Sequence, residues 1–204
     1  MSNLAIIDLK TATSESKLWR VQTAGYAQLY MNQTNANIEF DEASHLYKVN
    51  GLLVPSVSQV ISDNFYSNFD NVNKTVMDRA CSFGKAFHSA TQYLDEERLD
   101  LNSIDKGLAP YLVNYEKFKK EYIKEYVVIE KMFYSKKLNV CGRIDRVAVM
   151  KEESKSIRRI VVIIRENDYQ VIEHKDRSDT NAFISACSLT NWRLVNKIKG
   201  ANHE

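Results

Sequence analysis

The chain has 204 residues, of which 44% are hydrophobic and 26% are charged, and its formal net charge is +2. This length suits one domain with a buried core, and only 6 glycines and 2 prolines exclude a low-complexity chain. The charge is too small to indicate a nucleic-acid partner by itself, so a DNA-binding face would have to be local. The three cysteines are too widely spaced for a zinc or iron–sulfur pattern.

No apolar run approaches the length needed to cross a bilayer, and no basic leader precedes one. We therefore expect a protein without a membrane partner, located in the cytoplasm.

The first half of the chain predicts a strand, a helix and a hairpin. Residues 4–9 are apolar and predict a buried strand, and residues 16–30 have helical periodicity. Residues 32–39 open with a polar stretch and are interpreted as a linker. The segment from Tyr47 to Val54 predicts a hairpin that turns at Asn50-Gly51, and the Pro-Ser pair after it predicts the start of a helix.

The second half predicts two long helices, a run of strands and a final helix. The helices are expected at 74–95 and 110–126, and the aromatic stripe of the second, at positions 111, 115, 118 and 122, is expected in the core. Strands follow, and a last helix is expected to open with Asp179 as its cap. The predicted strands are 127–134, 140–150, 159–164 and 169–173. This mixture predicts an α/β domain with a central mixed sheet flanked by helices.

An acid and a lysine end the first strand. Asp8 and Lys10 are two positions apart and so share a face of the strand. A carboxylate beside a lysine at the end of a buried strand is costly unless a metal ion or a reacting anion uses both, although a surface ion pair is the simpler interpretation. Gln22 and Tyr26 lie one helical turn apart and share a face of the next helix.

Two further motifs contain residues that can do chemistry. His88 follows Gly84 by one helical turn and has Lys85 nearby, although a single helical histidine is more often structural or exposed. Asp145, in Gly142-Arg-Ile-Asp145, interrupts a β-rich run. An aspartate is unfavourable in the middle of a strand, so it requires a partner.

Together these four motifs resemble the RecB-like branch of the PD-(D/E)XK nuclease superfamily, and especially phage-type exonucleases that process DNA ends for recombination. Tyr47–Ser58 is also similar to the N-terminal stretch of such proteins. The resemblance implies a restriction-endonuclease-like core. In that family the Asp-x-Lys strand and the Gln/Tyr helix follow the strand of Asp145, whereas here they precede it. A single domain 1–204 would then consist of a displaced strand–helix segment at 1–31, the linker at 32–39 and the rest of the core at 40–204.

The resemblance also implies roles for individual residues. A Mg²⁺ or Mn²⁺ ion would be bound by Asp8, Asp145, the carbonyl of Leu9 and His88. Lys10 would orient the attacking water and stabilise charge on the phosphate. Gln22 and Tyr26 would brace the DNA strand or the catalytic lysine, and Lys85 would also contact DNA. Glu130 is a further candidate, as an acid that binds a second metal or supports the ligands of the first.

The sequence contains a rival for the Asp-x-Lys pair. Glu173 and Lys175 form a Glu-x-Lys pair after an apolar dipeptide, and they lie downstream of Asp145 in the expected order. No Gln-x-x-x-Tyr helix follows them, and their flanks are typical of exposed turns.

Three functions remain open from the sequence. The first is a metal-dependent deoxyribonuclease, an exonuclease that hydrolyses phosphodiester bonds at DNA ends for recombination or repair. The second is a catalytically inactive DNA-end binding module of the same fold, and the third is a non-enzymatic interaction domain. In the first case we expect DNA as the partner, in a bacterial or phage-infected cell, with a recombination or single-strand-annealing protein and a homo-oligomer as further possibilities.

Overall fold

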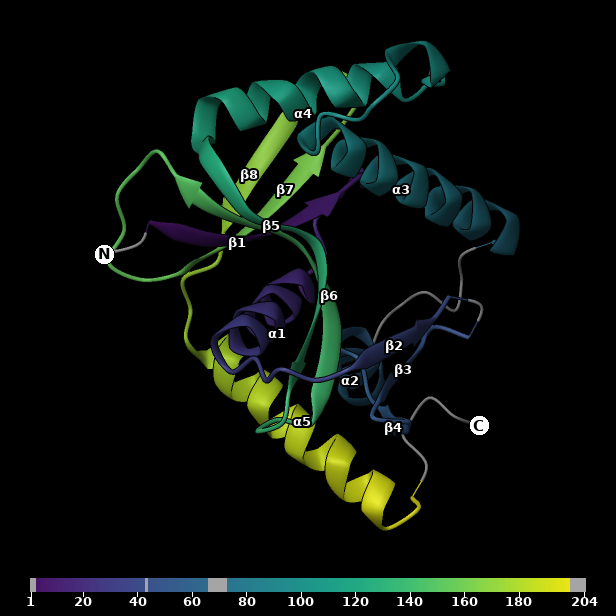
Figure 1. Ribbon diagram of the computed structural model, residues 1–204, viewed down its shortest axis with the longest axis vertical. Coiled ribbons are helices and arrows are strands. Elements are labelled where there is room, and N and C mark those ends of the chain that lie inside the picture. The colour runs from purple at the N-terminus through teal and green to yellow at the C-terminus, as the bar shows by residue number, and fades with distance from the viewer. Residues whose placement is uncertain (1–2, 43, 66–72, 199–204) are drawn as a thin grey trace. The chain divides into compact units, whose positions relative to one another are not determined.

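The computed structural model describes residues 3–42, 44–65 and 73–198. The chain divides into two compact units. Unit 1 comprises Met1–Glu15, Asn68–Glu130 and Asp145–His174, and unit 2 comprises Ser16–Ser67, Lys131–Ile144 and Lys175–Glu204. The boundary at Glu15 falls inside the strand–helix segment 1–31 of the sequence interpretation. The structure is α/β, with a five-stranded mixed sheet and a three-stranded sheet flanked by helices (Figure 1).

The five-stranded sheet has the order β5-β6-β1-β7-β8. At its centre, β1 (Leu4–Lys10) pairs antiparallel with β6 (Val140–Met150) and parallel with β7 (Arg158–Ile164). Strand β8 (Tyr169–Glu173) pairs antiparallel with β7, and β5 (Ile123–Ser135) lies beyond β6. The interior of β1 and most of β7 are buried, which is why these strands are continuous apolar runs and not alternating ones.

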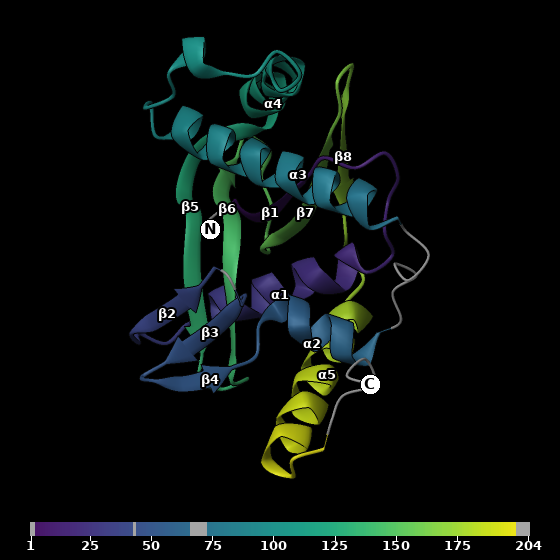
Figure 2. The same cartoon turned by 90° about the vertical axis from the view of Figure 1, so that its right-hand side faces the viewer.

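Helices α3 (Lys74–Asp95) and α4 (Ala109–Tyr122) pack on the sheet residues of unit 1 (Figures 1 and 2). A short 3₁₀ helix, η1 (Leu101–Ser103), connects them. The core joins Phe87 of α3 and Phe118 of α4 to alternate β1 residues, such as Ile7. Tyr115 and Phe118 are 0% exposed, and Tyr111 and Tyr122 pack against the same cluster. The prediction that the aromatic stripe lies in the core is confirmed.

Unit 2 contains α1 (Trp19–Met31), α2 (Val57–Asn64), α5 (Ser178–Val195) and a three-stranded meander. Figure 2 shows the meander, which consists of β2 (Ile38–Asp41), β3 (Leu46–Val49) and β4 (Leu52–Val54). The predicted hairpin turn is confirmed, because Asn50 and Gly51 both have positive φ, 51° and 79°, as a two-residue type I′ turn requires. The hydroxyl of Ser56 caps α2 by accepting from the N–H of Gln59 at 3.0 Å.

Three sequence predictions differ from the structure, two in one boundary of an element and one in a helix cap. The supposed linker 32–39 includes the start of β2, whose Ile38 pairs with Val49. The helix predicted to 126 ends at Tyr122, because the β-branched run from Ile123 joins the sheet. Asp179 does not cap the last helix. It lies one residue inside it, and its Oδ1 accepts from Nε of Arg20 at 2.6 Å.

Within the described residues, each helix is too short or too polar to span a bilayer.

Candidate metal centre

The end of the β1–β6 ladder positions Asp145. The pairing runs from Leu4 opposite Val149 to Ile7 opposite Arg146. Just beyond this pairing, the backbone N–H of Leu9 donates to Oδ2 of Asp145 at 2.8 Å. Asp145 is 8% exposed. The partner that a mid-strand aspartate requires is therefore a backbone amide of the neighbouring strand.

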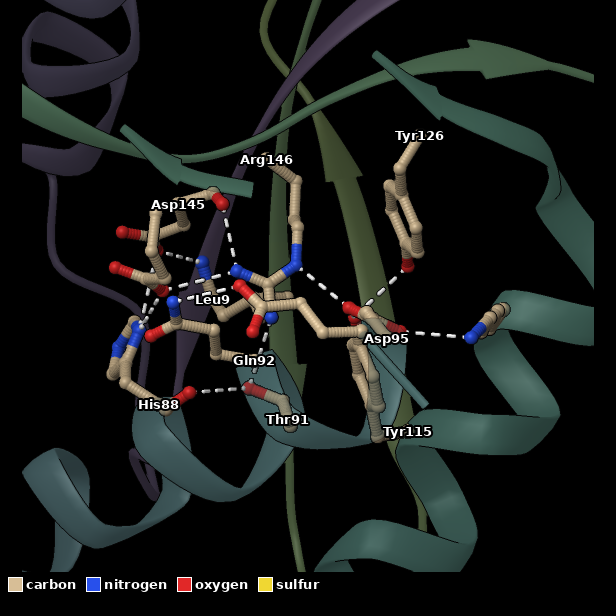
Figure 3. A network of polar contacts seen from close by, with 12 residues as sticks. Leu9, His88, Thr91, Gln92, Asp95, Tyr115, Tyr126, Asp145 and Arg146 are labelled. Atoms are coloured by element: carbon tan, nitrogen blue, oxygen red, sulfur yellow. Dashed lines mark hydrogen bonds and ion pairs between the residues drawn. The ribbon is translucent and has the colours of Figure 1, made fainter. Parts of the chain in front are cut away.

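His88 and Glu130 meet Asp145 at this point. Nδ1 of His88, on α3, lies 3.1 Å from Oε1 of Glu130 and 3.8 Å from Oδ2 of Asp145. Figure 3 shows the imidazole of His88 turned toward Asp145. One ligand atom from each of the three residues lies within 4.8 Å of the others, so the cluster could hold a metal ion. An imidazole nitrogen with two carboxylate oxygens is a donor set that suits Mn²⁺, and oxygen ligands also suit Mg²⁺.

Asp8 and Lys10 lie next to this cluster in the sheet. Oδ1 of Asp8 pairs with Nζ of Lys10 at 2.9 Å, and Asp8 is 2% exposed. Its Oδ2 is buried and finds no hydrogen-bond partner within residues 3–42, 44–65 and 73–198. A buried carboxylate oxygen without a partner is costly, and a nearby cation would remove that cost.

Burial and neighbouring charges shift the pKa values of Asp8 and His88 upward. Burial raises the pKa of Asp8 to about 6; Lys10 opposes this rise and Asp145 adds to it. Burial by itself would lower the pKa of His88, but Asp145 and Glu130 outweigh it and raise that pKa to about 9. Without a metal, the imidazolium therefore supplies the positive charge between these carboxylates near neutral pH.

The observed cluster differs from the predicted metal set because it contains Glu130 and does not include Asp8 or Leu9. The sequence interpretation assigned Asp8, Leu9, Asp145 and His88 to the ion, with Glu130 as a further candidate. The structure groups Glu130 with His88 and Asp145, while Asp8 is paired with Lys10. Leu9 contributes its N–H to Asp145. The sequence signal for Glu130 was the same as for Asp145, an acid within a β-branched run.

The remaining predicted residues are not members of the three-residue cluster. Gln22 and Tyr26 belong to unit 2, where Nε2 of Gln22 donates to the hydroxyl of Tyr26 at 3.1 Å, and Lys175 also belongs to that unit. Lys85 is exposed on α3. Glu173 lies on β8, separated from β6 by β7 and β1, and its Oε2 pairs with Arg158 at 2.9 Å. The structure therefore brings together His88, Glu130 and Asp145, with the Asp8–Lys10 pair beside them.

Sequence reasoning missed Arg146 and Asp95. Both side chains are 0% exposed, and Nε of Arg146 donates to Oδ2 of Asp95 at 2.8 Å. Arg146 also contacts Glu130. The only available signal was an arginine within a β-rich run, which by itself indicates no particular partner.

No protein-family model matches the chain, and no curated protein matches its sequence. The molecule is thus defined by its α/β fold and by a cluster of His, Glu and Asp that could hold a metal ion. Any assignment of function depends on this site.

Proposed function

We propose that the protein is a metal-dependent deoxyribonuclease that hydrolyses phosphodiester bonds at DNA ends. The observation that carries the proposal is the cluster of His88, Glu130 and Asp145 beside a buried Asp8–Lys10 pair. Among the described residues, Oδ2 of Asp8 lacks a partner, which supports a cation in this region. The pairing of β1 with β6 also supports the proposal, because it brings the strand of Asp8 and Lys10 beside the strand of Asp145 although the two are far apart in the sequence.

The proposed roles follow from charge and position. His88, Glu130 and Asp145 would hold Mg²⁺ or Mn²⁺, which would lower the pKa of a bound water and neutralise charge on the phosphate. The side chain of Lys10 is 22% exposed, so its ammonium can reach a substrate while Asp8 holds it in place. In that position Lys10 would donate a hydrogen bond to a phosphate oxygen or to the attacking water.

A digestion assay tests this function. Purified protein is incubated with linear DNA and with covalently closed circular DNA of the same sequence, with Mn²⁺, with Mg²⁺ or with a chelator. We expect the metals to support degradation of the linear DNA only. Asp145→Asn should abolish degradation, whereas the control Glu173→Gln should retain it. Undiminished cleavage by Asp145→Asn, or no cleavage by the unaltered chain, would refute the proposal.

A second function is favoured by one observation. Lys10 is already held in an ion pair with Asp8, and Asp8 is not a member of the three-residue cluster. This arrangement would also suit a DNA-end binding module that does not cleave. Such a protein would bind DNA with an affinity that falls steeply with salt, and it would leave the DNA intact at every metal concentration.

A further inference from the structure

Arg146 is a fully buried charge directly beside the candidate metal centre. It follows Asp145 on β6, and it lies opposite Ile7, a core residue, in the register with β1. Directly opposite residues share a face of the sheet, so Arg146 enters the side covered by α3 and α4. A guanidinium that is 0% exposed is strongly unfavourable unless acceptors surround it.

All three guanidinium nitrogens of Arg146 have acceptors, as Figure 3 shows for its labelled partners. Nε donates to Oδ2 of Asp95 at 2.8 Å, and Nη2 donates to Oγ1 of Thr91 at 3.2 Å. Nη1 donates to Oε1 of Glu130 at 3.0 Å and to the carbonyl of Asp145 at 2.7 Å. The guanidinium therefore contacts two members of the metal cluster: the side chain of Glu130 and the backbone carbonyl of Asp145.

Asp95 anchors the other side of Arg146. Its carboxylate is 0% exposed and accepts from Nζ of Lys119 at 2.8 Å and from the hydroxyl of Tyr115. Burial raises the pKa of Tyr115 well above its ordinary value, so this hydroxyl remains a donor. The hydroxyl of Tyr126 lies 2.9 Å from that of Tyr115 and extends the network to β5. Residues of α3, α4, β5 and β6 thus hold the guanidinium in one place.

Glu130 is the residue that needs such support. It has a φ of 43°, in the left-handed region, which costs a residue other than glycine on the order of 1–3 kcal/mol. Oε1 of Glu130 is held by both Arg146 and His88. Because Arg146 engages Oε1, the carboxylate can turn its other oxygen toward a cation without losing its buried partner.

We propose that Arg146 is a positioning residue: it fixes the carboxylate of Glu130 so that Glu130, His88 and Asp145 bind one divalent cation together. This inference rests on the proposed metal centre, and it adds the residue that orients the centre. Arg146 acts through Glu130, with Asp95 as its anchor. Partners that orient ligands in this way contribute about tenfold to hundredfold in metal affinity.

Calorimetric titration with Mn²⁺ tests the inference without any DNA. The dissociation constant is measured for the unaltered chain, for Arg146→Lys, for Glu130→Gln and for the double variant. Lysine keeps the charge but cannot reach Glu130 and Asp95 at once. We expect Arg146→Lys to weaken Mn²⁺ binding about tenfold in the unaltered background and to have no effect in the Glu130→Gln background. The control Arg158→Lys, on β7, should leave the affinity unchanged.

The outcomes separate this inference from the proposed function. No Mn²⁺ binding by the unaltered chain overturns both. Normal binding with no effect of Arg146→Lys, or with the same loss in both backgrounds, overturns only the role of Arg146. If Arg146→Lys shows no cooperative unfolding transition, the variant Asp95→Asn is used instead. This variant keeps Arg146 and removes the carboxylate charge that anchors the guanidinium. Asp95→Asn should also weaken Mn²⁺ binding, and an unchanged affinity would overturn the inference.

Discussion

The backbone N–H of Leu9 donates to Oδ2 of Asp145 at 2.8 Å, and this bond joins β1 to β6 where their pairing ends. The same oxygen lies 3.8 Å from Nδ1 of His88. Asp145 therefore connects the sheet to the candidate metal centre. Its substitution should separate the two roles, because an amide can still accept a hydrogen bond from Leu9 but carries no charge.

We expect Asp145→Asn to fold, but to unfold at a lower temperature than the unaltered chain when metal is absent, because it removes a charge that raises the pKa of His88. The stabilisation that Mn²⁺ gives the unaltered chain should disappear, since ligands stabilise only the state that binds them. Thermal denaturation with and without Mn²⁺ measures both quantities. Glu173→Gln is the matched control and should keep the full Mn²⁺ shift; an equal shift in Asp145→Asn would contradict the assignment of Asp145 as a ligand.

The metal-free protein should lose stability as the pH rises. His88 has a folded pKa of about 9 against an ordinary value of 6.5, so its contribution is full below 6.5 and is lost as the pH passes through 9. Asp8, raised from 3.8 to about 6, acts in the same direction at lower pH: its contribution is full below 3.8 and is lost as the pH passes through 6.

Urea denaturation of chelator-treated protein at a series of pH values measures this effect. Between neutral pH and pH values above the His88 transition, the free energy of unfolding should fall by on the order of 2 kcal/mol, after allowing for solvent screening of the partly exposed imidazole. His88→Gln should flatten that part of the curve. A curve that keeps its slope in the variant would show that another group titrates.

Lys10→Gln should impair catalysis more than metal binding. Removing the ammonium takes a donor from the reacting phosphate, and losses of this kind are about 10²–10³-fold in kcat. Mn²⁺ affinity should not decrease, because Lys10 is paired with Asp8, which is not one of the three proposed ligands. Rates on linear DNA and calorimetry measure the two effects. A large loss of Mn²⁺ affinity in Lys10→Gln would contradict the proposed role of Lys10. Substitution of an exposed lysine on α3, Lys85→Gln, should instead raise KM and leave kcat unchanged.

Two glycines on helices should respond oppositely to alanine. A Cβ at Gly25 would lie 2.7 Å from the ring of Phe183, so Gly25→Ala should destabilise the protein by about 1–3 kcal/mol. A Cβ at Gly84 would lie 3.8 Å from Oγ1 of Thr11, an ordinary contact, so Gly84→Ala should stabilise α3 by about 0.5–1 kcal/mol. Urea denaturation compares them. If Gly84→Ala is stable but cleaves DNA poorly, the open backbone at Gly84 serves the approach of substrate to His88.

Local patterns were enough to predict most elements. The apolar run of β1, the helical spacing from Lys74 to Asp95 and the Asn50-Gly51 turn each follow from neighbours in the chain. Local patterns failed at Ile123, where a helical spacing of aromatic residues and a β-branched run overlap. There the choice depends on whether the segment has a strand to pair with, and the residues that meet this end of β5 lie at the far end of β6, where the N–H of Lys151 donates to the carbonyl of Tyr122.

The sequence by itself determined which side chains could do chemistry, because an acid, a histidine or a lysine has the same donors and charge in any fold. Only the tertiary structure decided which of them meet. It placed Glu130 with His88 and Asp145, held Asp8 against Lys10, and buried Arg146 between Glu130 and Asp95. The reason is that strand register, the direction of each side chain and the approach of a helix are set by packing across the whole sheet, and residues close in the sequence do not contain that information.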